Sequence, residues 1–144
     1  MSGKIAVYGN CGSLWNCKNP MANLTPYCGF RLFDGCAALT VAPDLPALVV
    51  PMAAYGRMFA GCTSLVEAPY LPATTLATYC YNTMFSGCTS LTTVQDTLPA
   101  MNLGQYCYMS MFMNCSSLQT APQLPAVVLN YGCYYSMFAG SGLI

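Results

Sequence analysis

One phrase of this chain returns about every 26 residues, and that period constrains the fold more than any other feature. The phrase Gly-Cys-Thr-Ser-Leu occupies residues 61–65 and again residues 87–91. Aligning the chain on it produces a column of phenylalanines, separated by 26, 26, 27 and 26 residues: Phe33, Phe59, Phe85, Phe112 and Phe138. A fixed period of about 20–50 residues predicts a solenoid, in which each coil covers the apolar face of its neighbour.

Two cysteine columns run through the same repeats. The first holds Cys36, Cys62, Cys88 and Cys115, and the second holds Cys28, Cys80, Cys107 and Cys133, with Ala54 in the remaining place. Three interpretations are open: a buried ladder of thiols, disulfides between neighbouring coils, and a zinc site. The alanine favours the ladder, because it cannot form a bond, and no Cys-x-x-Cys pair supports zinc. We expect these cysteines to line the interior with Phe59, Phe85, Phe112 and Phe138.

The spacing within one repeat predicts an α/β repeat solenoid. Leu76, Cys80 and Met84 recur at the interval of one helical face, which predicts a short helix or helical turn over 75–86. Gly87 is expected to end it. The segment after each Gly-Cys phrase ends in Leu-Pro and is expected to be extended. Its prolines remove backbone donors, so we expect short, irregular parallel strands.

The repeats also divide the chain. Residues 1–27 are predicted to be a degenerate capping repeat, and residues 28–144 a solenoid of about four further repeats. One residue is inserted within 91–100. The phrase Met-Phe-Ala-Gly-Ser-Gly-Leu-Ile at 137–144 lacks a polar capping segment, whereas solenoid ends need one. We therefore expect self-association or further chain at that end.

The phrases "MFAGCTSLVEAPYLPATTL" and "MFSGCTSLTTVQDTLPAMNL" resemble the leucine-rich repeats of bacterial surface antigens, the group called BspA-like. The resemblance covers roughly residues 28–143. It implies a curved, leucine-rich-repeat-like solenoid and a role in attachment or recognition on a bacterial surface or a phage particle. The repeat here is longer than the usual unit of that group, and its Cys-Tyr column is additional.

Composition argues against several functional classes. Charged residues make up only 6% of the chain and the formal net charge is zero, so we expect no nucleic-acid partner. No apolar run is long enough to span a bilayer, so we expect no membrane insertion. The chain has no histidine, the commonest general base and metal ligand. We therefore expect no enzyme, no catalytic residues, no cofactor and no metal. Asp44 and Glu67 could bind a cation or act on a glycoside, but a solvated edge is the more typical role.

The positions that vary between repeats indicate where a partner binds. After each leucine anchor one row of the sequence changes, and its members are Asp44, Tyr70, Asp96 with Thr97, and Gln123. A tyrosine column follows the second cysteine column: Tyr55, Tyr81, Tyr108 and Tyr134. These tyrosines either pack between coils with their hydroxyls in solvent or form a binding stripe.

Our first hypothesis is a non-enzymatic recognition or adhesion module that binds a protein or a glycan through its repeat face. The alternative is a structural subunit that assembles end to end into a filament or a particle lattice. The N-terminal sequence lacks the apolar region of a secretory signal. Together with unpaired thiols, this favours a phage particle assembled in a reducing cytoplasm, with a bacterial cell surface as the other expected location.

Overall fold

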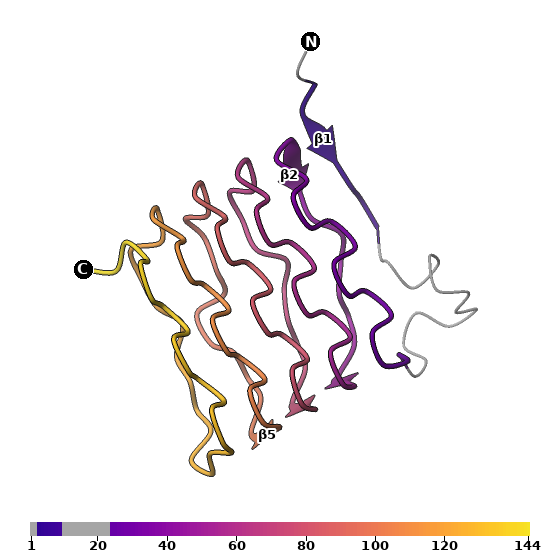
Figure 1. The fold of residues 1–144 in the computed structure, drawn as a ribbon, viewed down its shortest axis with the longest axis vertical. Helices are drawn as coiled ribbons and strands as arrows, with labels where there is room; N and C mark the ends of the chain where they lie inside the picture. Colours follow the sequence, from indigo (N-terminus) through magenta and orange to yellow (C-terminus); the bar gives the residue numbers. More distant parts are fainter. Residues whose placement is uncertain (1–2, 10–23) are drawn as a thin grey trace.

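The structure is a computed structural model that describes residues 3–9 and 24–144. The chain winds into successive coils that lie side by side, each occupying its own band from the N-terminal to the C-terminal flank (Figure 1). Every coil contains one ten-residue run of turns: 26–35, 52–61, 78–87, 105–114 and 131–140. These runs form what we call the turn side. The segments that connect them, 36–51, 62–77, 88–104 and 115–130, form the strand side. The predicted repeat solenoid is therefore confirmed.

The strand side contains the short parallel strands that the Leu-Pro segments predicted. Strand β1 (Ile5–Ala6) pairs in parallel with β2 (Leu39–Val41). A second parallel sheet has the order β3 (Val49–Val50), β4 (Thr75–Leu76) and β5 (Asn102–Leu103). Isolated parallel bridges join Glu67 to Thr93 and Thr97 to Gln123. Pairing is interrupted because each strand-side segment contains at least one proline, which lacks the N–H that a ladder needs.

The predicted helix is wrong, because no helix occurs among the described residues. Residues 78–87 instead form consecutive turns in which every fourth residue has a positive φ: 58° at Tyr79, 50° at Thr83 and 75° at Gly87. The same positions recur in the other coils. Because the backbone conformation repeats every four residues, the side chains of residues i, i+4 and i+8 point the same way. The same spacing is expected of one face of a helix. Gly87 does terminate the run, in the left-handed conformation that favours glycine.

Along each of the first four turn runs the backbone N–H groups alternate between two acceptors: a carbonyl of the next coil and a carbonyl three residues back in the same run. The N–H of Phe85 donates to the carbonyl of Met111 in the next coil at 2.9 Å. The N–H of Cys88 donates to the carbonyl of Phe85, three residues back, at 3.0 Å. A helix would direct all of these bonds along a single segment, whereas here half of them join neighbouring coils. The turn side is therefore a hydrogen-bonded stack as well as an apolar one.

The core consists of columns of identical side chains. The Phe59 and Phe85 rings stack with their centroids 5.5 Å apart and an angle of 6° between their planes. The same geometry continues outward to Phe33 at one end and through Phe112 to Phe138 at the other. Phe59, Phe85 and Phe112 are buried, whereas the two end members are half-buried. Centroid separations of about 4.5–7 Å are favourable for aromatic pairs, so the column contributes beyond its apolar area.

The cysteines form the expected ladder in the interior coils. Each thiol of one column donates to a phenylalanine carbonyl of the preceding coil: Cys62 to Phe33, Cys88 to Phe59 and Cys115 to Phe85, each at 3.1 Å. The thiols are free at Cys36, Cys62, Cys80, Cys88, Cys107, Cys115 and Cys133. The first coil departs from the prediction, because Cys36 is exposed and Cys28 is half-buried. No described coil covers these two side chains on their N-terminal side.

The side chain of Gln95 forms hydrogen bonds at the place where the chain has one inserted residue. Gln95 accepts a hydrogen bond from the N–H of Leu71 at 2.6 Å and donates to the carbonyls of Leu71 and Thr97 at 3.1 and 2.6 Å. Its amide thus pairs with a backbone position of the neighbouring coil. Leu71 is buried, so without this amide its polar groups would be left without partners.

Most of the predicted capping repeat cannot be compared with the structure. Residues 10–23, including Cys11 and Cys17, lie outside the described residues. Within the described part, Val7 and Asp44 join the N-terminal segment to the first full coil: the N–H of Val7 donates to Val41, and that of Asp44 donates to Gly9. The capping function of residues 1–27 remains a prediction.

Candidate functional site

The strand side carries three adjoining open hollows. The first is lined by residues 40–42, 44 and 67–70, the second by 67, 68, 70 and 93–97, and the third by 92–96 and 120–123. Their volumes are about 250, 510 and 440 Å³. Neighbouring hollows share a wall, so together they form one continuous surface across four coils. We call this surface the strand-side row.

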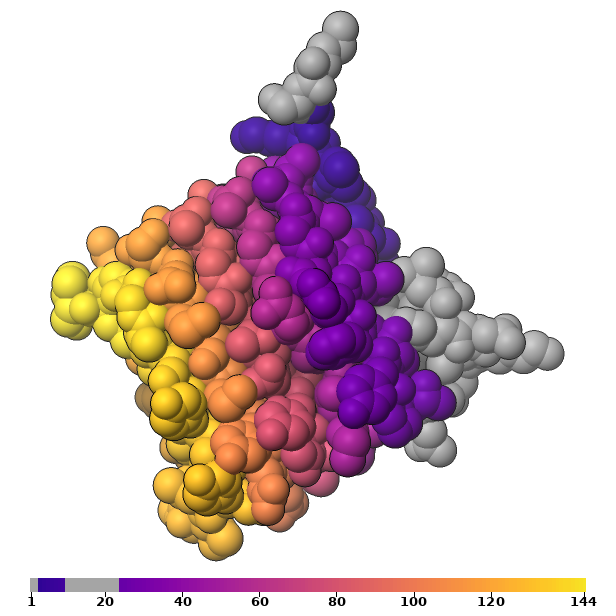
Figure 2. All heavy atoms as spheres, viewed as in Figure 1, coloured from indigo at the N-terminus to yellow at the C-terminus, as the bar shows by residue number. Residues whose placement is uncertain are grey.

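The variable positions singled out by the sequence come together here. Asp44 lines the first hollow, Tyr70 lines the first and second, and Gln123 lines the third. Asp96 lines both the second and the third. All four side chains are exposed, and 68% of the surface of Tyr70 is accessible. Each coil occupies its own band of the molecular surface, so a row of this kind crosses successive bands (Figure 2).

The insertion shifts one member of the row. The parallel bridge between Thr97 and Gln123 shows that Thr97 occupies the column that Gln123 continues. Asp96 precedes this column, and its carbonyl accepts a hydrogen bond from the N–H of Gln123 at 2.8 Å. The extra residue lies among residues 94–96, between the bridged positions Thr93 and Thr97. Sequence alignment paired the two residues without deciding between them. The row also includes Glu67 and Thr93, joined by a bridge of their own, which the sequence had not assigned to it.

The strand-side row is polar and acidic. Asp44, Glu67 and Asp96 line it, and none of them forms an ion pair with a described residue. Both ion pairs of the described chain converge on Asp34, on the turn side. There Arg31 lies 2.7 Å and Arg57 lies 3.3 Å from the same carboxylate oxygen. Partial burial opposes ionisation of Asp34, but hydrogen bonds from Arg31 and Arg57 outweigh it and lower its pKa. Both arginines are therefore paired with Asp34 on the turn side, and neither pairs with a carboxylate of the strand-side row.

The tyrosine column is not a binding stripe. Tyr55, Tyr81 and Tyr108 are each only 1% exposed, and their rings stack between coils at 6.0 and 5.7 Å. Tyr134, in the last coil, is half-buried. Burial raises the pKa of Tyr134 to about 12 and raises that of Tyr81 and Tyr108 as well. The expectation that these hydroxyls reach solvent is wrong for the three interior tyrosines, because the coils close over them.

The interior thiols are not placed for chemistry. Burial raises the pKa of Cys62, Cys107 and Cys115 to about 12, so these thiols stay protonated near neutral pH. A thiolate is the form that attacks substrates and binds metals. Among residues 3–9 and 24–144, no group of three or more potential metal ligands comes together. That part of the chain also contains no helix of the length and apolar character needed to cross a bilayer.

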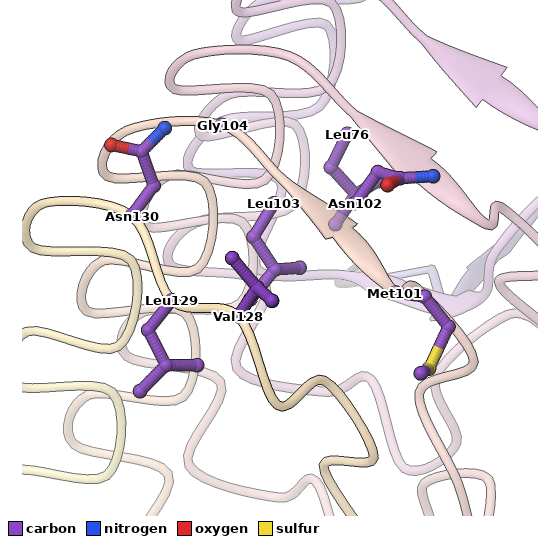
Figure 3. Close-up of a pocket in the computed structure, with 8 residues that line it drawn as sticks. All are labelled: Leu76, Met101, Asn102, Leu103, Gly104, Val128, Leu129 and Asn130. Atoms are coloured by element: carbon purple, nitrogen blue, oxygen red, sulfur yellow. The ribbon is translucent and has the colours of Figure 1, made fainter.

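A separate hollow of about 280 Å³ lies beside β5, on the C-terminal flank (Figure 3). Leu103, Val128 and Leu129 contribute apolar walls, and Asn102 and Asn130 add amides. The segment 128–130 does not pair with β5, so β5 is an edge strand. This hollow is formed by three successive coils, through residues 76, 101–104 and 128–130, and shares no lining residue with the strand-side row.

Comparison with known proteins identifies no relative of this chain. No protein family matches the chain, and neither does any curated protein or solved structure.

Proposed function

We propose that the protein is a non-enzymatic recognition module that binds a protein or a glycan through the strand-side row. The observation that supports this most directly is the convergence of Asp44, Tyr70, Asp96 and Gln123 on three adjoining hollows. These are positions at which the repeats differ, although the turn side repeats closely. A surface whose side chains vary on a constant scaffold is suited to recognition.

The chemistry of the row favours polar partners that carry a flat apolar face. Tyr70 offers an exposed ring, while Asp44, Asp96, Thr97 and Gln123 offer hydrogen-bond acceptors and donors around it. Sugar rings present such faces, and so do arginine side chains of a protein partner. The resemblance of the repeats to BspA-like proteins supports placing this activity on a bacterial surface or a phage particle.

The test is binding of the labelled protein to a glycan array and to bacterial cells. Tyr70→Ala is expected to lower binding at least about tenfold, as loss of a central aromatic contact does. Tyr135→Ala is the matched control, because Tyr135 is 66% exposed but lies on the turn side. Binding to neither target would contradict the proposal, and so would equal losses in the two variants.

A further inference from the structure

Two tyrosines stack on each other at the outer surface of the turn side. Tyr79 in the third coil and Tyr106 in the fourth occupy equivalent places in their turn runs. Their ring centroids are 5.1 Å apart, with an angle of 1° between the ring planes. Tyr79 is 40% exposed and Tyr106 is half-buried. Both tyrosines belong to interior coils, so the coils on either side of the pair are part of the described structure.

Small residues flank this pair in its column. The equivalent place holds Ala53 in the second coil and Gly132 in the fifth. The Tyr106 ring lies directly against Gly132, because a Cβ added there would be 2.5 Å from the ring carbons Cδ1 and Cε1. Tyr131 contacts Tyr106 edge-on, with the ring centroids 5.3 Å apart. Tyr106 is therefore positioned on both faces, by the Tyr79 ring and by the glycine backbone.

Two other groups of tyrosines lack this combination of ring contact and exposure. Tyr55, Tyr81 and Tyr108 stack on one another, but each is only 1% exposed. Tyr70 and Tyr135 are 68% and 66% exposed, but neither pairs with another aromatic ring of residues 3–9 and 24–144. A reagent in solution can therefore reach the Tyr79–Tyr106 pair, whereas it cannot reach the buried stack.

We propose that Tyr79 and Tyr106 form an oxidative cross-linking site, at which a haem peroxidase with hydrogen peroxide joins the third coil to the fourth. Each phenol loses one electron and one proton, and the two phenoxyl radicals form a carbon–carbon bond between the ring positions beside their hydroxyls. The hydrogens on those two carbons then move to the oxygens, which restores both hydroxyls. In total the chain loses two hydrogen atoms, and hydrogen peroxide takes up two electrons and two protons to become two water molecules.

The stacked arrangement favours this bond over a bond between separate molecules. Equivalent places in adjacent coils direct the two side chains the same way, so their hydroxyl-bearing ends lie side by side. Groups that are held in contact react as if their concentration were very high. Because both side chains lie at the surface, their rings can turn toward the geometry that the bond requires. The product replaces a ring contact between two coils with a covalent bond.

The experiment is oxidation of the 144-residue chain by a haem peroxidase with hydrogen peroxide, followed by cleavage at aspartate. The oxidised monomer is isolated by size, reduced and unfolded, and then cut by a protease that cleaves before aspartate. One cut falls before Asp96, between the two tyrosines, so fragments 44–95 and 96–144 stay together only where a cross-link joins them. The expected product is a joined pair of fragments that shows dityrosine fluorescence and is lighter than their sum by two hydrogen atoms.

Phenylalanine variants locate the cross-link, because phenylalanine keeps the ring but cannot form a phenoxyl radical. Tyr79→Phe and Tyr106→Phe are each expected to lower the joined fraction at least about tenfold, as loss of a reactant held in contact does. Tyr81→Phe is the buried control and Tyr70→Phe is the exposed control, and both should leave the joined fraction unchanged. Tyr70 belongs to the strand-side row, so this test is independent of the proposed recognition function.

Four outcomes would overturn the proposal. The first is an oxidised monomer whose two fragments separate completely, and the second is a joined fraction that Tyr106→Phe leaves at the parental level. The third is an equal loss in Tyr81→Phe. The fourth is an unchanged joined fraction when the chain is unfolded in urea before oxidation, because the folded stack would then not be what brings the two rings together.

Discussion

The turn side and the strand side of each coil follow different rules. On the turn side the backbone needs positive φ at fixed places and stacked rings fill fixed places of the core, although exposed columns there also vary. On the strand side the hydrogen-bonded ladder is short, prolines interrupt it, and side chains such as Asp44, Tyr70 and Gln123 vary and face solvent. The comparison teaches that the turn side supplies the regular backbone hydrogen bonds and the stacked rings, whereas the strand side combines buried leucines with exposed positions that are free to vary.

Alkaline pH should have the strongest effect on stability, because several buried thiols from both sides of the coil act together. The pKa of Cys62, Cys107 and Cys115 is about 12 in the folded protein, against an ordinary value of 9.0. Unfolded thiols therefore ionise first, so the stabilisation is fully present below about pH 9 and is lost as the pH rises toward 12. Denaturant midpoints measured from neutral to alkaline pH should fall over this range, and less steeply in Cys62→Ala. A midpoint that stays constant up to pH 11 would contradict the buried ladder.

Removing one ring of the phenylalanine column should have the largest effect among single substitutions. Phe85 is buried and stacks on both Phe59 and Phe112, so Phe85→Ala should lower the free energy of unfolding by about 3–5 kcal/mol. Tyr70→Ala, on the strand side, should change it by less than about 0.5 kcal/mol. Chemical denaturation measures both, and comparable losses would remove the distinction between the two sides.

Gln95 lies on the strand side, but we expect its side chain to contribute to the free energy of unfolding. Gln95→Ala removes the amide that pairs with both backbone groups of buried Leu71, so it should cost about 1–3 kcal/mol. The matched control is Gln123→Ala, because Gln123 is exposed and makes only a 3.4 Å side-chain contact with Thr97. If the two substitutions cost the same, Gln95 does not hold the insertion in place.

The smallest of these effects tests the backbone of the turn side. Gly87 has a φ of 75°, and an added Cβ would lie 3.8 Å from Gly61, which is an ordinary contact. Gly87→Ala should therefore cost about 1–2 kcal/mol for conformational reasons alone. Gly87→Asn should cost less, because asparagine tolerates this conformation and Asn114 occupies the equivalent place in another coil. An alanine variant as stable as the parent would argue against the alternating turns.

The sequence predicted the solenoid, the columns and the parallel strands because each of these follows from the 26-residue period. It did not predict the turn run, since a four-residue backbone repeat and a helical face share the interval between Cys80 and Met84. The recurring Gly35, Gly61 and Gly87 were the available signal, because every one of them has a positive φ.

Asp44, Tyr70 and Gln123 line adjoining hollows because they hold similar offsets from the leucine anchor, and their role in binding stays a prediction. The tyrosine column was assigned to the wrong environment, because a repeated aromatic has the same sequence pattern whether it is buried or exposed. The part played by Gln95 could not be read from sequence, since it depends on how the neighbouring coil presents Leu71.

The central claim is that like side chains lie above like in successive coils. Nuclear Overhauser spectroscopy on a sample with protonated phenylalanine rings in a deuterated background tests it most directly, with Phe59→Leu and Phe85→Leu used to assign the signals. The account predicts a strong ring-to-ring cross-peak between Phe59 and Phe85, whose centroids are 5.5 Å apart. A well-folded protein without a cross-peak between these two rings would contradict it.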